Sequence, residues 1–495
     1  MHKVIHKITM FLICIGLSLA SLGIMVNGNN NRQPVKADAT PQLLTRIKHR
    51  GKLIVGTSAD YPPFEFKQGS KYEGIDMDIA RDIANKIGVK LEIKNMDFDS
   101  LLVALETHKV DMVIAALNPT PQREKSVAFS KSYYTDGNDL LIRKNDKDKI
   151  TGLKDLTSHS TVGVQTGSVQ AELVKKQLPH VKTKGLTKLN SLVIALKTGK
   201  VNAVVMDEAT AKAYVQNDHS LSCLHAGFTG QSPANAIAFP KGSASQSLIS
   251  LANHEITQLK KKQTIDKHYA PHAVALMMSH KSKRHVWNYT NYFISGIEIT
   301  LLITVISTGI GVVLGTLLAL LRLGTNKILK WLSIAYIEFV RGTPLMVQVM
   351  FMYFGVGMLI KNLPALVAGI IAVALNSGAY VAEIIRSGIM AVDKGQTEAA
   401  VSLGMSRRQM YRYIILPQAL RNIWPALGNE FVTLIKESSL VSVIGVGELM
   451  YQTQMVQAAT YQGVLPLAVT MVIYFVITFT LTRLLNWGER RINHD

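Results

Sequence analysis

The longest apolar segment of the chain runs from Tyr292 to Leu321 and contains a single charged residue, Glu298. A segment of this length and composition is typical of a helix that crosses a lipid bilayer. Further spans are expected at Pro344–Ile360, Pro364–Ile385, Phe431–Met455 and Leu465–Leu485. The sequence therefore predicts an all-α transmembrane domain with about five spans over residues 291–495.

Charged residues interrupt one of these segments. Lys436, Glu437 and Glu448 fall inside Phe431–Met455, so we expect a broken span that is surrounded by protein. Glu430, Lys436 and Glu437 either line a transport pathway or form an internal ion pair that stabilises the break.

Basic residues fall almost entirely on one side of the predicted membrane, and Lys361 is nearly alone on the other. The clusters are Arg322, Lys327 and Lys330, then Arg386 to Arg421, then Arg483, Arg490 and Arg491. Because cytoplasmic loops are rich in Lys and Arg, we predict a multi-pass protein of the cytoplasmic membrane with a cytoplasmic C-terminus. This distribution accounts for the net charge of +20 without a nucleic-acid partner.

The N-terminus has the features of a secretory signal. Lys3 and Lys7 precede an apolar run from Ile8 to Val26, and Ala37-Asp38-Ala39 is a small-x-small cleavage site. We predict a signal peptide over residues 1–39, with an uncleaved anchor as the alternative. Cleavage leaves Cys223 without a second cysteine, so the exported part must be held together by its hydrophobic core.

Residues 40–275 alternate between short apolar runs, such as Lys52–Thr57, and segments of helical periodicity, such as Ile75–Gly88. Such alternation predicts parallel sheets covered by helices. The alternation restarts near Ser160, which predicts an α/β extracellular domain with two lobes. Lobe 1 covers about 42–138 and 236–275, lobe 2 covers about 139–235, and residues 276–290 form a tether. The chain is expected to cross between the lobes near Asn138–Ile142 and Ser232–Ala238.

Ligands of parallel sheets bind beyond the carboxyl ends of the strands, which selects the turns after Gly56, Ala115 and Met206. Arg123 follows the second turn and can hold a carboxylate through two parallel hydrogen bonds, while Asp207 can supply the counter-charge for an ammonium group. An ordinary surface arginine and a helix N-cap would explain the same two residues. Core packing is the other explanation of Tyr61 and Phe98.

A motif lies between the third and fourth predicted spans, where Glu398-Ala399-Ala400 precedes Gly404 and then Ile414, Leu416 and Pro417. Helix-forming residues followed by a glycine suited to positive φ predict a helical hairpin, whose second helix Pro417 interrupts. The spacing resembles the cytoplasmic coupling loop of ABC importer permeases, and Arg341-Gly342-Thr343-Pro344 resembles their polar-amino-acid branch. The resemblance covers roughly residues 291–493. It implies that Glu398, Ala399, Ala400 and Gly404 dock on a separate ABC ATPase subunit.

A second resemblance covers about Leu43 to Ala275. Thr57–Phe66, Gly74–Ala80 and the turn at Arg123 resemble extracellular solute-binding proteins for polar amino acids, of the family 3 type. The resemblance makes Arg123 the ligand of the α-carboxylate and Asp207 the ligand of the α-ammonium. The other residues of the implied substrate site are Ser58, Asp60, Tyr61, Phe98, Ala116, Asn118, Gly167 and Ser168. Among these, Asn118 and Ser168 assist Arg123, Tyr61 and Phe98 form apolar walls, and Gly167 allows close approach of the backbone.

Two positions depart from the relatives. Ala115 and Ala116 stand where some relatives carry Ser, and Ser58 stands where histidine- and glutamine-binding relatives carry an Asp that contacts the ligand side chain. The missing acid disfavours a basic ligand, although Asp60 or Glu65 can replace it. We therefore expect a polar amino acid, with glutamine favoured and basic amino acids next.

The chain contains no Gly-x-x-x-x-Gly-Lys-Ser/Thr loop, so we assign ATP and Mg²⁺ to a partner ATPase and expect no cofactor in this chain. The expected function is the binding and permease subunit of an amino-acid importer, not an enzyme, with the permease acting as a homodimer in membrane lipid. A ligand-gated channel with the same clamp is the alternative, but that class inserts its pore segments between the lobe-forming stretches. A membrane-anchored enzyme such as a dehydratase would need an acid/base pair in addition to Arg123 and Asp207.

Overall fold

The computed structural model describes residues 42–68, 71–229, 234–279, 285–360, 363–460 and 462–493. The predicted signal peptide, residues 1–39, lies outside the described residues. So do residues 280–284 of the predicted tether and residues 230–233 at the predicted second crossing.

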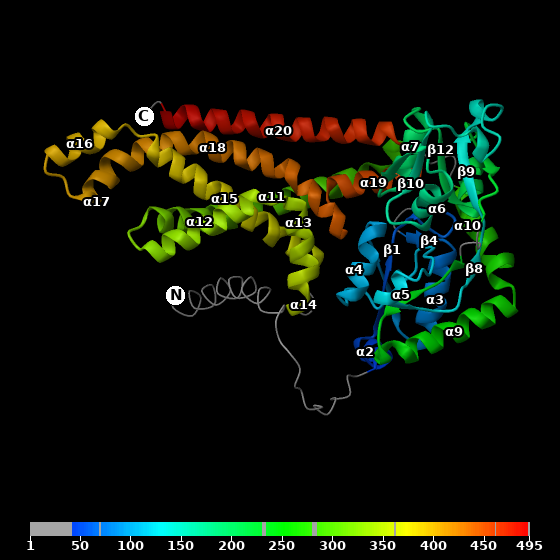
Figure 1. Cartoon of the computed structure of the whole chain (residues 1–495). Coiled ribbons are helices and arrows are strands. Elements are labelled where there is room, and N and C mark those ends of the chain that lie inside the picture. Colours follow the sequence, from blue (N-terminus) through cyan, green and yellow to red (C-terminus); the bar gives the residue numbers. More distant parts are fainter. Residues whose placement is uncertain are drawn as a thin grey trace. The chain divides into compact units, whose positions relative to one another are not determined.

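The first lobe is built on a five-stranded sheet with the order β5-β1-β6-β15-β7 (Figure 1). β1 pairs in parallel with β5 and β6, and β15 is antiparallel to β6 and β7, so the sheet is mixed rather than purely parallel. The strands are β1 (Lys52–Thr57), β5 (Lys90–Asn95), β6 (Met112–Val113), β7 (Val127–Phe129) and β15 (Ala238–Pro240). The helices are α2 (Leu43–Arg50), α3 (Ile75–Ile87), α4 (Leu101–Glu106), α5 (Arg123–Ser126) and α9 (Gln246–Lys261). The strand predicted at Lys52–Thr57 and the helix predicted from Ile75 are confirmed.

The second lobe is built on another five-stranded sheet, with the order β11-β10-β12-β9-β13. β10 is parallel to β11 and β12, while β9 is antiparallel to β12 and β13. The strands are β9 (Asn138–Arg143), β10 (Thr161–Gln165), β11 (Lys182–Leu186), β12 (Ala203–Asp207) and β13 (Leu221–His225). The helices are α6 (Val169–Gln177), α7 (Leu189–Lys197) and α8 (Glu208–Asn217).

A short two-stranded ladder joins the two sheets. β8 (Tyr134–Thr135) pairs with β14 (Ala234–Asn235). The first crossing was expected near Asn138–Ile142, but β9 is paired with β12 from Asn138 onward and belongs wholly to the second sheet. That expectation is wrong by a few residues: the chain crosses before β9, through β8, because from Asn138 onward its backbone is already paired within the second sheet.

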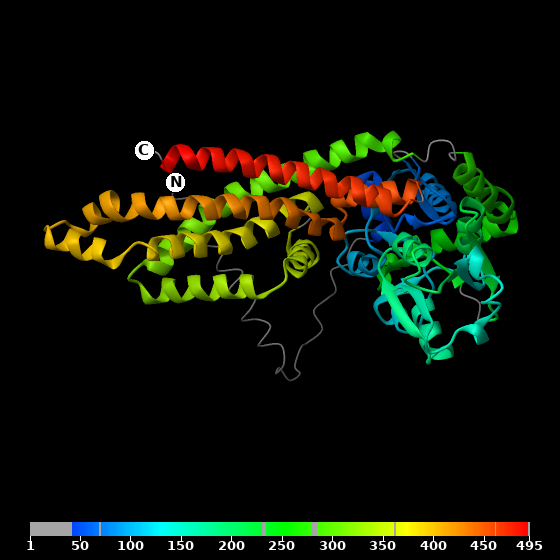
Figure 2. The same ribbon diagram turned by 90° about the horizontal axis from the view of Figure 1, so that it is seen from above.

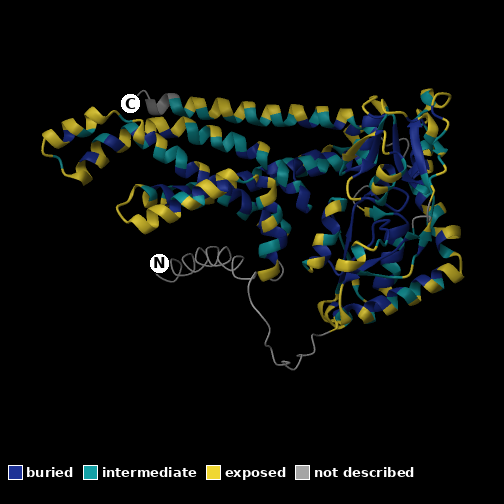
Figure 3. Ribbon diagram, in the orientation of Figure 1, coloured by how far each residue is buried: buried dark blue, intermediate teal, exposed yellow. Residues whose placement is uncertain are grey.

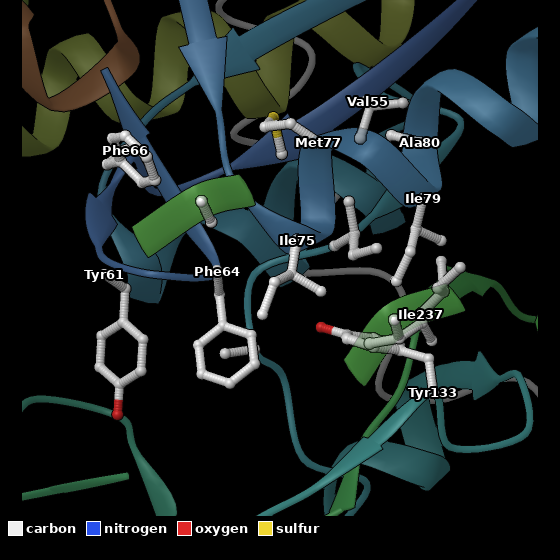
Figure 4. Packing of buried hydrophobic residues seen from close by; sticks show 14 of the residues in the cluster. Val55, Tyr61, Phe64, Phe66, Ile75, Met77, Ile79, Ala80, Tyr133 and Ile237 are labelled. Atoms are coloured by element: carbon white, nitrogen blue, oxygen red, sulfur yellow. The ribbon is translucent and has the colours of Figure 1, made fainter. Parts of the chain in front are cut away.

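The turn after β1 is fixed against the start of α3. The backbone N–H groups of Ile75 and Asp76 donate to the carbonyl oxygens of Pro63 and Phe64 at 3.1 and 2.9 Å. Gly74 makes this approach possible, since its φ is +122° and a Cβ atom there would collide with the Phe64 carbonyl group. Figure 4 shows Phe64 and Ile75 inside the resulting cluster, where both are fully buried. This packing positions the adjoining strands β2 (Asp60–Tyr61) and β3 (Glu65–Gln68), which pair with each other, and β3 pairs in turn with β4 (Lys71–Glu73).

The C-terminal part is helical, as predicted. Three helices of the described chain are long and apolar enough to cross a membrane: Val286–Leu323, Ala365–Met390 and Val464–Glu489. The pair Lys327–Gly342 and Leu345–Leu359 is bent by 106° and makes a fourth span if it counts as one. The elements are α11 (Thr290–Leu323), α12 (Lys327–Gly342), α13 (Leu345–Met350), η8 (Phe351–Val356), α14 (Gly357–Leu359), α15 (Ala365–Met390) and α20 (Val464–Asn493).

The span expected at Phe431–Met455 is not a continuous helix. α18 (Leu416–Glu437) ends, η10 (Ser438–Ile444) follows, and α19 starts only at Leu449 and runs to Thr460. The break has two visible causes. Gly445 has φ +80°, and the Glu448 carboxylate accepts the backbone N–H groups of Met450 and Tyr451 at 2.7 Å, which caps α19. Within the described residues, three or four helical segments thus meet the length and apolarity of a span, fewer than the five expected, while the expected interruption is confirmed.

Small residues allow α11 and α15 to pack closely. A Cβ atom at Gly315 would lie 2.6 Å from the Val381 side chain, and one at Gly311 would lie 2.7 Å from the Ser377 hydroxyl. Close contact through small residues is the usual way in which membrane helices associate. In contrast, α20 carries a row of exposed apolar side chains, including Met471 and Phe475 (Figure 3).

Two glycines with the same φ of +122° give a test of the first-lobe packing. We expect Gly242→Ala to cost about 1–3 kcal/mol from backbone strain alone, because nothing lies within 4 Å of its added Cβ atom. Gly74→Ala adds the collision with Phe64 to the same strain, so its cost should be clearly larger. Hydrogen–deuterium exchange of peptides from β1 and α3 in the full chain measures the opening free energy. Equal costs for the two variants would contradict this account of the turn.

Candidate functional site

The carboxyl ends of β1 and β12 meet across the cleft between the lobes. The backbone N–H of Asp207 donates to the Tyr61 hydroxyl at 3.1 Å. Figure 4 shows the Tyr61 hydroxyl pointing out of the first-lobe cluster, and the Tyr61 and Phe64 ring centroids are 6.3 Å apart. Tyr61 therefore belongs to the core of one lobe and contacts the other with its polar end.

Arg123 is held between both lobes. Its guanidinium donates to the carbonyl oxygen of Asn118 at 2.6 Å and to that of Gly167 in the second lobe at 2.8 Å. It also lies over the Phe98 ring, 5.7 Å from the centroid. Burial lowers the pKa of Arg123 to about 10, which leaves it charged at neutral pH. The two hydrogen bonds use two of its five N–H donors, so donors remain for a carboxylate.

Asp207 is 1% exposed, and its carboxylate accepts a hydrogen bond of 2.7 Å from Gln170. It precedes α8 without capping it through its side chain. The first N–H groups of α8 are taken by the Gly137 carbonyl at 3.0 Å and by the Asp136 carboxylate at 2.7 Å. Burial, reinforced by Asp136, raises the pKa of Asp207 to about 8. The N-cap explanation of Asp207 therefore does not account for its buried carboxylate.

Other residues of the predicted site have partners within the protein. Asp60 accepts from the Ser58 hydroxyl at 3.0 Å and, across the cleft, from the backbone N–H of Leu189 at 2.9 Å. Ser168 caps α6 by accepting from the backbone N–H of Ala171 at 3.3 Å.

The remaining predicted positions lie in the same cleft region. The Asn118 amide donates to the Asn235 side chain at 2.7 Å. Ala116 has φ +43° and donates its backbone N–H to Asp76 at 2.8 Å. Gly167 has φ +78°, and a Cβ atom added to it would lie 3.8 Å from the Asp99 side chain. Contacts thus connect Asp60, Tyr61, Arg123, Gly167 and Asp207 across the two lobes, and several of the other predicted residues mainly hold the adjoining turns in place. Their role in binding a ligand stays a prediction.

Several contacts cross from lobe to lobe, which describes a closed arrangement. They are Tyr61 with Asp207, Asp60 with Leu189 and Arg123 with Gly167. A salt bridge of 2.8 Å between Lys188 and Asp97 is a fourth contact that the sequence analysis did not single out. Lys188 is buried, and its pKa is nevertheless raised, because the carboxylates of Asp60 and Asp97 stabilise its charge.

Glu65 is the residue whose importance the sequence analysis understated. It is 1% exposed, and the side chain that hydrogen-bonds with it is another acid, Asp76. Burial raises its pKa well above the usual range, and the neighbouring acids Asp76, Asp60 and Asp207 raise it further. The Tyr133 hydroxyl beside this group hydrogen-bonds with Asp76 rather than with Glu65. The only sequence signal was the position of Glu65 directly after the Tyr61–Phe64 turn.

The predicted coupling loop is a helical hairpin. α16 (Lys394–Ser402) is followed by Gly404 with φ +73°, then by α17 (Arg407–Met410) and η9 (Tyr411–Ile415). Pro417 does not end the second helix: it lies in the first turn of α18, where its missing N–H is not needed, and the π-helical turn η9 leads into it. The expected interruption of the second helix at Pro417 is therefore not observed: the chain stays helical and only changes from the π-helical turn η9 to α18.

The surface of this hairpin is partly apolar. Ala400 is buried against Met410 and Ile415, whereas Glu398 and Ala399 are exposed. Val401 and Leu403 are 62% and 81% exposed at its tip. The hairpin and the C-terminal end of α20 lie at the same end of the helical domain in both views (Figures 1 and 2).

Comparison with known proteins covers both parts of the chain. Residues 53–273 match the family of bacterial extracellular solute-binding proteins, family 3. Residues 311–494 match the family described as binding-protein-dependent transport system inner membrane component.

Individual relatives match one part each. The arginine transport system permease protein ArtQ of Bacillus subtilis is 43% identical over 41% of this chain and 94% of its own length. The arginine-binding extracellular protein ArtP of the same organism is 38% identical over 43% of this chain and 85% of its own length. The glutamine transport system permease protein GlnP of Escherichia coli is 38% identical over 42% of this chain and 95% of its own length. The chain therefore belongs to the amino-acid importers of the ABC class, and it joins a family 3 solute-binding domain and a transmembrane permease domain in one polypeptide.

Proposed function

We propose that this importer subunit captures an amino acid with a cationic side chain, arginine in the first place, outside the cell and passes it across the cytoplasmic membrane. The observation that carries the proposal is Glu65, a buried acid whose charged neighbours Asp76, Asp60 and Asp207 are all acids as well.

The backbone ends of any free amino acid fit the two charged groups that face each other in the cleft. Arg123 is fixed by Asn118 and Gly167 and keeps donors for an α-carboxylate. Asp207 is buried and offers a carboxylate to an α-ammonium. These two residues bind what all amino acids share, so they do not select a side chain.

Selection of the side chain then falls to the remaining charges. The acids Asp60, Glu65, Asp76 and Asp97 lie around the cleft, and Lys188 is the cation that compensates Asp60 and Asp97. Asp76 accepts the backbone N–H of Ala116, which leaves Glu65 as the acid most in need of a cationic partner. A guanidinium satisfies a buried carboxylate with two hydrogen bonds and an opposite charge, whereas a glutamine amide supplies hydrogen bonds alone.

The names of the relatives support both substrates. ArtP is named for arginine binding and ArtQ for arginine transport, while the E. coli relative is named for glutamine transport. Glutamine, favoured by the sequence alone, therefore remains the competing ligand in the experiment below. Nothing in the described structure favours a ligand-gated channel.

Transport requires partners that this chain does not contain. An ABC ATPase subunit would dock on the hairpin of α16 and α17, where Glu398, Ala399, Val401 and Leu403 are exposed. Two permease domains would enclose the pathway as a homodimer. The binding domain faces the outside, and the hairpin and the C-terminus face the cytoplasm, in keeping with the distribution of basic residues.

Replacing Glu65 tests the choice of ligand. We expect the purified full chain in lipid nanodiscs to bind arginine more tightly than glutamine in calorimetric titration. Glu65→Gln should weaken arginine binding by about 10- to 100-fold, because a charge-assisted contact worth about 1.5–3 kcal/mol is lost, and should leave glutamine binding nearly unchanged.

The matched control is Glu92→Gln, which removes a half-exposed carboxylate that pairs with Lys52 at the surface of the same lobe. It should leave both affinities as in the wild type. Tighter binding of glutamine than of arginine by the wild type would refute the proposed ligand while leaving the importer assignment intact.

The raised pKa of Glu65 also predicts a pH dependence. A cationic ligand binds the ionised carboxylate, so below the raised pKa each binding event must release a proton, and the affinity for arginine should increase as the pH rises from about 5.5 to 8. Arginine keeps its own charge over this range, so the dependence reports the protein. The slope should become shallower in Glu65→Gln but should not vanish, because Asp207, whose pKa is raised to about 8, also ionises in this range. An unchanged slope in Glu65→Gln would argue against a role of Glu65 in binding.

A further inference from the structure

Strand pairing in the second lobe brings together three side chains that the importer function does not use. His225, at the end of β13, lies opposite Asp139 in β9. Asp207, at the end of β12, lies opposite Asn138, so Glu208 follows at the start of α8 beside the same strand. One possible ligand atom from each of Asp139, Glu208 and His225 lies within 4.8 Å of the other two.

Asp139 is the member of this cluster whose carboxylate is buried. Its side chain is 4% exposed, and the one hydrogen-bond partner that the described residues provide for it is Nδ1 of His225 at 3.2 Å. The His225 side chain is itself 73% exposed, so this partner is free to turn away. A carboxylate with so little solvent and no resident cation is costly to bury, and a bound cation would remove that cost.

The surroundings leave access to the three groups. A Cβ atom on Gly137 would lie 3.0 Å from Oε2 of Glu208 and 3.7 Å from the His225 ring, so a larger residue there would crowd the cluster. Lys212, one turn further along α8, pairs with Glu208 and has a side chain that is 57% exposed. Lys212 is thus a competitor for Glu208 that a divalent ion can displace into solvent.

We propose that Asp139, Glu208 and His225 form a binding site for a divalent transition-metal ion such as Zn²⁺. Two carboxylates and an imidazole are ligands that Zn²⁺ accepts, and three protein ligands with an open position for water are a common arrangement. The ion would replace the Asp139–His225 hydrogen bond and the Glu208–Lys212 pair. It would connect β9, β13 and α8 within the second lobe, and its binding does not depend on which amino acid the cleft takes.

The test is a Zn²⁺ titration of the full chain, purified without a histidine tag, in lipid nanodiscs and in competition with a chelating dye. The chain has 14 histidines, so the site is identified by difference from variants. His225→Ala and Asp139→Asn should each lose one saturable Zn²⁺ site or weaken it by about tenfold or more. His219→Ala removes an exposed histidine of the same lobe and should bind Zn²⁺ as the wild type does.

Lys212→Met gives a change in the opposite direction. Removal of the competing ammonium should tighten Zn²⁺ binding, whereas a variant that merely disturbs the lobe would weaken it. Retained arginine or glutamine binding shows that each variant is folded. Zn²⁺ binding that is unchanged in His225→Ala and Asp139→Asn, or the absence of a saturable site in the wild type, would overturn the proposal.

Discussion

The hydrogen bond of 3.1 Å from the backbone N–H of Asp207 to the Tyr61 hydroxyl ties the carboxyl end of β12 to the turn after β1. Because both partners are anchored in the cores of their own lobes, this contact fixes the distance between the two halves of the clamp. Arg123 and Asp60 reach across the same gap to Gly167 and Leu189. The cleft is therefore closed around groups that are polar and charged but have little access to water.

Closure of this kind makes charge balance the decisive property of the site. Buried charges are tolerated when they are paired and are costly when they are not. Lys188 balances the acids near Asp97, and Arg123 has two carbonyl partners. The groups that act on Glu65 are the acids Asp76, Asp60 and Asp207 and include no cation, which is why we assign it to the ligand. The same reasoning applies to Asp139 in β9. This buried carboxylate has the exposed side chain of His225 as its hydrogen-bond partner.

Local sequence signals predicted the elements well, because they act within a few residues. The strand Lys52–Thr57, the helix that begins at Ile75 and the positive φ at Gly404 follow from apolar runs, helical periodicity and glycine. The roles of Ser58 and Asp60 could not be foreseen, because Asp60 is engaged by Leu189 from the other lobe. The segment Phe431–Met455 was expected to be one broken span, and the extent of the break could not be foreseen for a similar reason. Glu448 caps a separate helix, α19, through the backbone N–H groups of Met450 and Tyr451.

The ion pairs of Glu383 in the membrane domain are another example of contacts that local sequence signals do not predict. Glu383 in α15 bonds to Arg322 of α11 at 2.6 Å, and Arg341 of α12 approaches it to 4.0 Å. The sequence places Arg322 in a basic cluster and Arg341 in the Arg341–Pro344 motif, but only the packing of three helices brings both to one carboxylate. Such contacts connect the helix that leads into the α16–α17 hairpin with its neighbours.

The central claim is that the clamp and the permease of this chain act as one importer driven by a separate ATPase. The most direct test is uptake of radiolabelled arginine into proteoliposomes that contain the full chain with its co-purified ATPase, with ATP trapped inside. We expect uptake that needs ATP and is abolished by Arg123→Ala. Uptake that proceeds equally without ATP, or that is unaffected by Arg123→Ala, would contradict the account.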